Sequence, residues 1–120
     1  MTETIKNDDY IFNYISNKSI KNIMTDEIKY FFSDKRKICM VKTDNEKIEF
    51  YGKLSDIEAD LNKVPFVRTH QSYLVNYYLI RSRTKIEITL VNGKKLPISE
   101  ERQKYFNQQY SHLLGGEINV

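Results

Sequence analysis

A polar cluster occupies residues 66–76, where four hydrogen-bonding side chains fall within five positions. They are Arg68, His70, Gln71 and Ser72. Apolar residues flank the cluster on both sides, and such neighbours can hold a polar loop in one shape. Arginine and serine suit phosphate oxygens, and a glutamine amide can pair with the adenine edge in the major groove. The cluster therefore predicts a rigid loop that contacts nucleic acid.

The same cluster also has a purely structural interpretation. His70, Ser72 and Asn76 could satisfy backbone groups around an irregular turn. The residue types alone favour this interpretation for Asn76 and leave the choice open for the others.

Catalytic and cofactor chemistry find little support in the sequence. The four glycines form neither a G-x-G-x-x-G pattern nor a P-loop. The two histidines, His70 and His112, fall on separate elements, so they make no His-x-x-x-His metal pair. His70 and Ser72 could share a hydrogen bond, but nothing resembles a nucleophile elbow. We expect no enzyme, no cofactor and no metal site.

Cysteine content and hydropathy point to the compartment. Cys39 is the single cysteine, so an intramolecular disulfide is impossible and a buried, inert thiol is expected. The sequence has no apolar run long enough to span a membrane, and the first nine residues show no signal-peptide pattern. These features predict a cytoplasmic protein.

Positive charge is concentrated in one third of the chain. Residues 66–98 hold six Lys and Arg against one acid, Glu87, whereas residues 1–65 hold 11 against 12. Residues 99–120 hold two against three. A local basic excess is typical of a module that touches phosphate through one region, although a solvated basic face gives the same pattern.

Short β-like segments dominate the chain. Runs of β-branched and aromatic residues separated by turn residues predict strands over 10–15, 19–24, 28–32, 37–43 and 47–51. Residues 66–68 are extended, and the alternation of Ile86, Ile88 and Leu90 with polar residues predicts one strand over 81–91. Asn92-Gly93 predicts a tight hairpin to 94–98, with Pro97 on an edge strand.

Two helices complete the pattern. Leu54, Ile57 and Leu61 recur at helical spacing, and Pro65 bars continuation. Ser99 followed by two glutamates predicts the N-cap of a second helix, which Gly115-Gly116 would end. We expect one mainly β domain over residues 8–114, a sandwich or open barrel of hairpins, with flexible tails at 1–7 and 115–120.

The string Phe66-x-Arg68-x-His70-x-Ser72-Tyr73-x-Val75-Asn76 resembles the signature of LytTR domains, the DNA-binding output domains of bacterial response regulators of the LytR, AlgR and accessory-gene-regulator group. Seven positions match within eleven. The strand-to-helix step after Ile48 and the closing segment Asn92 to Ser99 also resemble the family, so the similarity covers roughly residues 8 to 110. It implies about ten strands in small antiparallel sheets.

The resemblance implies sequence-specific binding of duplex DNA by loops that enter successive grooves, usually over paired direct repeats. Carried onto this chain, the loops are Lys35-Arg36-Lys37, the turn at Gln71 and the turn after Ser99. Lys37 and Gln71 are the best candidates for base contacts, and Arg68 and Ser72 are assigned to phosphate or loop support. The candidate DNA-binding residues are Arg36, Lys37, Arg68, His70, Gln71, Ser72, Asn76 and Arg102.

One departure affects the third loop. Many family members carry arginine just after the closing serine, whereas this chain has Glu100 and Glu101. Either Arg102 takes over the contact or the loop contributes little.

The partners that the resemblance implies are duplex DNA and a receiver domain on a longer chain, with the domain monomeric in solution or dimeric on DNA. Two alternatives stay open: a β-rich protein-interaction module, and a single-strand binder that stacks bases on exposed aromatics.

Overall fold

The computed structural model describes residues 10–104 and 108, which form ten strands in three antiparallel sheets. A two-stranded ribbon consists of β1 (Ile11–Ser16) and β2 (Ser19–Met24). The five-stranded sheet runs in the order β5 (Lys47–Tyr51), β4 (Lys37–Lys42), β3 (Ile28–Asp34), β7 (Tyr73–Asn76) and β6 (Phe66–His70). The three-stranded sheet runs in the order β10 (Lys95–Pro97), β9 (Glu87–Leu90) and β8 (Ile80–Arg83). The predicted mainly β architecture is confirmed.

Three short helices join the strands. The α-helix α1 spans Leu54–Asp60, and the 3-10 helices η2 and η3 span Thr25–Glu27 and Tyr77–Leu79. The amphipathic pattern predicted α1 correctly, since Leu54, Ile57 and the following Leu61 are all buried. A further helix begins at Glu100, as the Ser99 cap predicts. Its predicted end at Gly115-Gly116 and both predicted tails lie outside the described residues.

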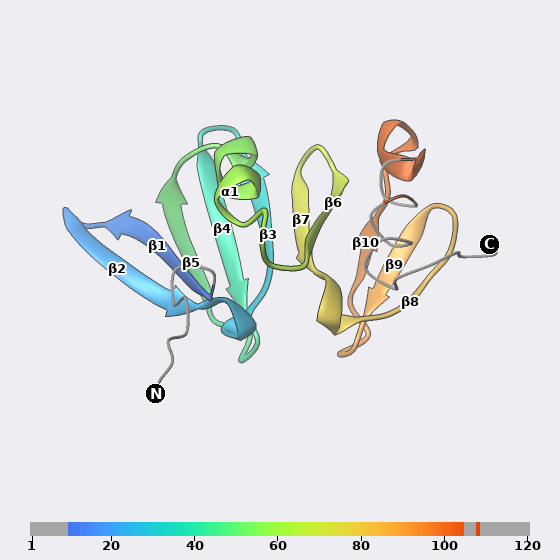
Figure 1. Cartoon of the computed structure of the whole chain (residues 1–120), viewed down its shortest axis with the longest axis horizontal. Coiled ribbons are helices and arrows are strands. Elements are labelled where there is room, and N and C mark those ends of the chain that lie inside the picture. The colour runs from blue at the N-terminus through green and yellow to red at the C-terminus, as the bar shows by residue number, and fades with distance from the viewer. Residues whose placement is uncertain (1–9, 105–107, 109–120) are drawn as a thin grey trace.

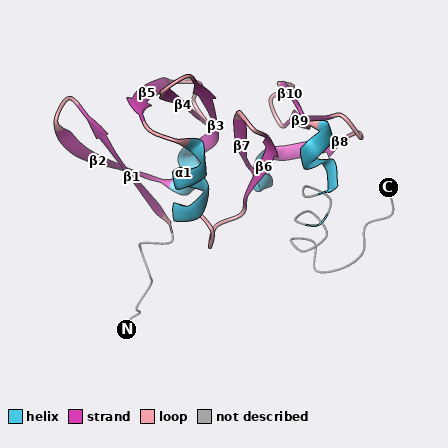
Figure 2. Cartoon of the chain, turned by 90° about the horizontal axis from the view of Figure 1, so that it is seen from above, coloured by secondary structure: helices cyan, strands magenta, loops and turns pink. Residues whose placement is uncertain are grey.

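The five-stranded sheet is covered on both faces because successive side chains along a strand point to opposite sides. One face carries Phe31, Met40 and Leu74, which pack into a cluster with α1 and the β1–β2 ribbon. The other face carries Tyr30, Val41 and Val75, which pack against the three-stranded sheet. The largest sheet is thus the central layer of the core (Figures 1 and 2).

The predicted loop over 66–76 is a β-hairpin. β6 pairs antiparallel with β7 through Phe66↔Asn76 and Val67↔Val75, and the register shifts between Arg68 and His70. The polar cluster therefore flanks a two-residue turn rather than filling a long loop.

The single strand predicted over 81–91 is wrong, because a turn at Thr84 divides it into β8 and β9. The Thr84 hydroxyl accepts hydrogen bonds from the backbone N–H groups of Ile86 and Glu87, at 3.3 and 3.2 Å. Ile86 is consequently 64% exposed, whereas Ile88 and Leu90 are fully buried as predicted. The Asn92-Gly93 hairpin is confirmed, with Gly93 at φ +92°.

The strand directions create two opposite edges. The β3–β4 turn, the β6–β7 turn and the segment after β10 lie at the upper edge in Figure 1. The β4–β5 turn, η3 and the β9–β10 turn lie at the lower edge. We call these the contact edge and the opposite edge.

Candidate nucleic-acid interface

Backbone hydrogen bonds join the three segments of the contact edge. The Ser33 N–H at the end of β3 donates to the Ser72 carbonyl at 3.0 Å. On the other side of the same hairpin, the Ser99 N–H donates to the Thr69 carbonyl at 2.9 Å. Segments near residues 35, 71 and 100 are therefore held side by side, although they are far apart in the sequence.

The side chain of Arg68 holds the β6–β7 turn from beneath. Its Nε donates to the His70 carbonyl at 3.0 Å, and its Nη2 donates to the Gln71 carbonyl at 2.6 Å. Its Nη1 pairs with the Glu58 carboxylate of α1 at 2.6 Å. Arg68 is only 7% exposed, so it supports the turn and does not face solvent as a phosphate contact would.

Glu58 is a functional residue that the motif did not reveal. It neutralises a buried guanidinium, which would otherwise carry a large desolvation cost. Glu58 follows Ile57 on α1, next to the apolar stripe that contacts the sheet. The amphipathic pattern of the predicted helix could have indicated Glu58, because an acid beside the apolar stripe can reach a cation on the sheet.

His70 and Ser72 close the turn between them. The Ser72 N–H donates to Nδ1 of His70 at 3.0 Å, so that nitrogen is the acceptor and carries no proton in this bond. The His70 ring packs edge-on against Tyr73, with ring centroids 5.6 Å apart. Both side chains are half-buried, whereas Gln71 at the tip of the turn is exposed.

Asn76 does not lie at the contact edge, so its prediction as a DNA-binding residue is corrected. Its side chain is buried, with Nδ2 donating to the Ile28 carbonyl and Oδ1 accepting from the Tyr78 N–H, both at 3.0 Å. It caps η3 at the far end of β7. The structural interpretation, which the residue types favoured, holds for this residue.

The β3–β4 turn presents three consecutive cations. Lys35, Arg36 and Lys37 are all exposed, and Lys35 adopts a positive φ of 62° that tightens the turn. The Arg36 carbonyl accepts from the Gly52 N–H at 3.1 Å, which ties the turn to the end of β5.

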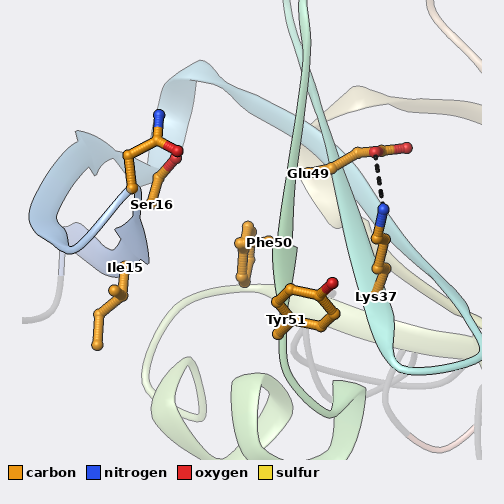
Figure 3. A pocket seen from close by; sticks show the side chains of 7 residues that line it. Ile15, Ser16, Lys37, Glu49, Phe50 and Tyr51 are labelled. Atoms are coloured by element: carbon orange, nitrogen blue, oxygen red, sulfur yellow. Dashed lines mark ion pairs between the residues drawn. The ribbon is translucent and has the colours of Figure 1, made fainter.

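Lys37 has neighbours that sequence reasoning missed. Its ammonium lies 3.9 Å from the Glu49 carboxylate and 5.8 Å from the centre of the Tyr51 ring. Lys37 and Glu49 are diagonal neighbours on the β4–β5 pair, in which Lys37 is opposite Tyr51. They lie beside a cavity of about 210 Å³ that Ile15 of the ribbon also lines (Figure 3). An exposed pair of this kind is weak, so Glu49 holds Lys37 only loosely.

The third segment begins a helix. The Arg102 N–H donates to the Ser99 hydroxyl at 3.2 Å, and this cap aims the start of the helix at the contact edge. Glu100 and Glu101 are exposed there, and Arg102 is half-buried.

The basic excess of residues 66–98 does not form one surface. Arg68 is buried beneath its turn, and Lys94 and Lys95 follow the β9–β10 turn at the opposite edge. Lys35, Arg36 and Lys37 are exposed cations of the contact edge, in a part of the chain whose overall charge is near zero. Lys85 of the basic segment lies in the β8–β9 turn, at the upper end of its sheet in Figure 1.

The model of the LytTr DNA-binding domain family matches residues 18–111. The chain belongs to this family. As a LytTR domain it is a DNA-binding domain of the kind found in transcriptional regulators.

Two proteins of similar sequence and one solved domain of similar fold accompany the family match. Transcriptional regulatory protein NatR of Bacillus subtilis is 30% identical over 76 residues, which are 58% of this chain and 33% of NatR. Sensory transduction protein LytT of Enterococcus faecalis is 26% identical over 85 residues, which are 67% of this chain and 35% of LytT. The chain spans about a third of the length of these curated relatives. A solved LytTr DNA-binding domain from Bacillus cereus shares the fold, with a TM-score of 0.70 and 18% identity over 84% of this chain and 96% of that one.

Within the described part of the LytTR domain, no helix is long and apolar enough to cross a membrane.

Proposed function

We propose that this LytTR domain binds duplex DNA sequence-specifically by laying its contact edge across successive grooves, as part of a transcriptional regulator. The observation that carries the proposal is that three segments lie together on one edge, joined by backbone hydrogen bonds. They are the turn with the exposed Gln71, the cationic turn at 35–37 and the helix that begins at residue 100. The regulatory part is supported by the names of the two relatives, since NatR is a transcriptional regulatory protein and LytT is a sensory transduction protein.

Each segment receives a role from its chemistry. Gln71 reads a base in the major groove, because an exposed amide on a fixed turn can pair with adenine N6 and N7. Lys37 reaches a second groove, and Lys35 and Arg36 neutralise phosphates. Arg68, His70 and Ser72 hold the reading turn in shape. Arg102 remains the candidate contact of the third segment.

The dimensions suit a duplex. The described residues extend 44 Å along their longest axis, slightly more than the roughly 34 Å of one helical turn of B-DNA. One domain could thus cover about one turn, and a pair of direct repeats would take two domains. With about six phosphate contacts, log K should fall against log salt with a slope of about −5.

Duplex DNA is favoured over single strands because the aromatic side chains of residues 10–104 do not form a stacking platform. Most of them fill the core, and the most exposed ones, Tyr51, Tyr78 and Tyr10, are scattered, with Tyr78 next to the opposite edge.

Selection of bound duplexes from a random library tests the proposal. The domain should enrich a repeated short motif, and Gln71→Ala should relax the preference at one position at a cost of about 1–3 kcal/mol in binding. Asn62→Ala, an exposed amide after α1, serves as the matched control. An unchanged motif with Gln71→Ala would exclude a reading role for this residue, and no enriched duplex would exclude sequence-specific binding.

A further inference from the structure

The opposite edge holds a buried lysine at the wall of a cavity. The cavity has a volume of about 100 Å³ and lies between the β4–β5 turn, η3 and the β9–β10 turn. Lys29 lines it and is only 5% exposed, and its ammonium donates to Oδ1 of Asn45. The cavity is also lined by Leu79 and Val91.

Lys29 has no carboxylate partner among residues 10–104, since none of the ion pairs found there includes it. The nearby acids Asp44 and Glu46 pair instead with Lys42, at 3.9 and 2.9 Å. Burial, together with the positive charge of Lys94, lowers the pKa of Lys29. A cation removed from water without a counter-charge is unfavourable, so the cavity favours an incoming anion.

A second, larger cavity shares the lining residue Leu79 with the first. It has a volume of about 330 Å³, and its lining also includes Val64, Pro65, Phe66 and Tyr78. Tyr78 is 73% exposed, so its ring is accessible to a partner.

We propose that the two cavities form a docking site for an extended segment of a partner protein that carries an acidic residue beside a large apolar one. The carboxylate pairs with Lys29, and the apolar side chain fills the cavity beneath Tyr78. Asp26, which lines the larger cavity, disfavours a second acid there and fixes the direction of the segment.

A protein segment fits this edge better than nucleic acid does. A phosphodiester chain would place charge along its whole length, next to Asp26 and the apolar walls. Because the site lies opposite the contact edge, the domain can hold DNA and the partner together (Figure 1).

Selection of peptides from a phage-displayed random 12-residue library on the 120-residue chain tests the proposal. The enriched peptides should carry Asp or Glu near an aliphatic or aromatic residue. Lys29→Met should weaken a selected peptide at least tenfold. Lys47→Met, an exposed lysine on the neighbouring strand end, should leave its affinity unchanged. Tyr78→Ala should weaken the peptide as well, which keeps the test valid should Lys29→Met alter folding.

The outcomes are distinct from those of the DNA experiment. Duplex affinity should be the same in Lys29→Met and wild type, because the site and the contact edge are separate. Failure to enrich any peptide, enrichment of peptides without acids, or equal binding by Lys29→Met would overturn the docking site and leave the DNA-binding proposal standing.

Discussion

At the scale of single residues, Arg68 shows how one polar side chain can hold a turn in shape from beneath. Its fork-shaped guanidinium offers several donors in a fixed plane, and here they reach two carbonyls of one turn and a carboxylate of α1. The turn that carries Gln71 is therefore held by side-chain hydrogen bonds as well as by the strand pairing.

Arg68→Lys should separate a supporting role from a phosphate contact. Lysine keeps the charge but cannot span the three acceptors, so we expect a loss of about 1–3 kcal/mol in DNA binding as the turn loosens. The slope of log K against log salt should stay the same, because no phosphate contact is lost. Fluorescence anisotropy over a salt series measures both quantities. A slope reduced by about one would identify Arg68 as a phosphate ligand.

Asn76→Ala should affect folding rather than recognition. The change leaves the Ile28 carbonyl and the Tyr78 N–H without partners inside the protein, and we expect the free energy of unfolding to fall by about 2–3 kcal/mol. Urea denaturation measures the loss, with the exposed Asn62→Ala as control. Duplex affinity, measured where both variants are folded, should not change, and a specific loss of affinity would return Asn76 to the interface.

The sequence predicted which residues gather at the site better than it predicted their roles. The spacing of Arg68, His70 and Ser72 indicated a shared local structure, and the hairpin confirms their proximity. Alternation along β6 places Arg68 on the same face as Phe66, which packs with α1, so the arginine lies under the turn and reaches Glu58. That direction depends on the partner Glu58, which the local motif does not contain.

At the scale of elements, turn chemistry decides where the strands end. Asn92-Gly93 predicted its hairpin because glycine accepts positive φ without strain. The turn at Thr84 escaped prediction since the apolar alternation of Ile86, Ile88 and Leu90 continues through it. A threonine hydroxyl that caps the backbone is a weaker signal in sequence than an Asn-Gly pair.

Gly93→Ala tests the contribution of the β9–β10 turn. A Cβ at this position meets no atom within 4 Å, so the cost comes from the backbone at φ +92° alone. We expect the free energy of unfolding to fall by about 1–2 kcal/mol. Gly52→Ala is the matched control, because its added Cβ makes only ordinary contacts, the nearest at 3.6 Å, and its φ is not positive. Equal losses in the two variants, measured by thermal denaturation, would contradict the role of positive φ.

At the scale of the whole molecule, the distribution of charge between the two edges differs from the distribution of charge along the sequence. Sheet order brings residues 35, 71 and 100 together and sends Lys94 to the other end. The cations of the basic segment are therefore divided between the two edges, and Lys35, Arg36 and Lys37 from outside that segment add to the contact edge. Only the pairing of strands distant in sequence, such as β3 with β7, creates that edge.

The buried Lys29 makes the stability of the whole domain depend on pH in a predictable direction. Because the pKa of Lys29 is lowered in the folded state, the unfolded state binds more protons at high pH. At pH 7 the charged Lys29 therefore lowers the free energy of unfolding. This cost disappears as pH rises through the folded pKa of Lys29 toward the ordinary value of 10.5. Lys29→Met should be more stable than wild type at pH 7, and the difference should shrink by pH 10. Urea denaturation of both proteins measures it, and a constant difference would contradict the unpaired charge.

Salt dependence tests the division of the molecule into two edges. Lys35→Gln with Arg36→Gln should reduce the magnitude of the slope of log K against log salt by about two, since each lost phosphate contact removes about 0.9. Lys94→Gln with Lys95→Gln removes the same net charge from the opposite edge. At 0.1 M salt, charges more than about 10 Å from the DNA are largely screened, so this control should leave the slope nearly unchanged. Anisotropy titrations from low to physiological salt compare the two pairs directly. Equal slope changes would mean that DNA affinity depends on net charge alone. The contact edge would then not be the binding surface.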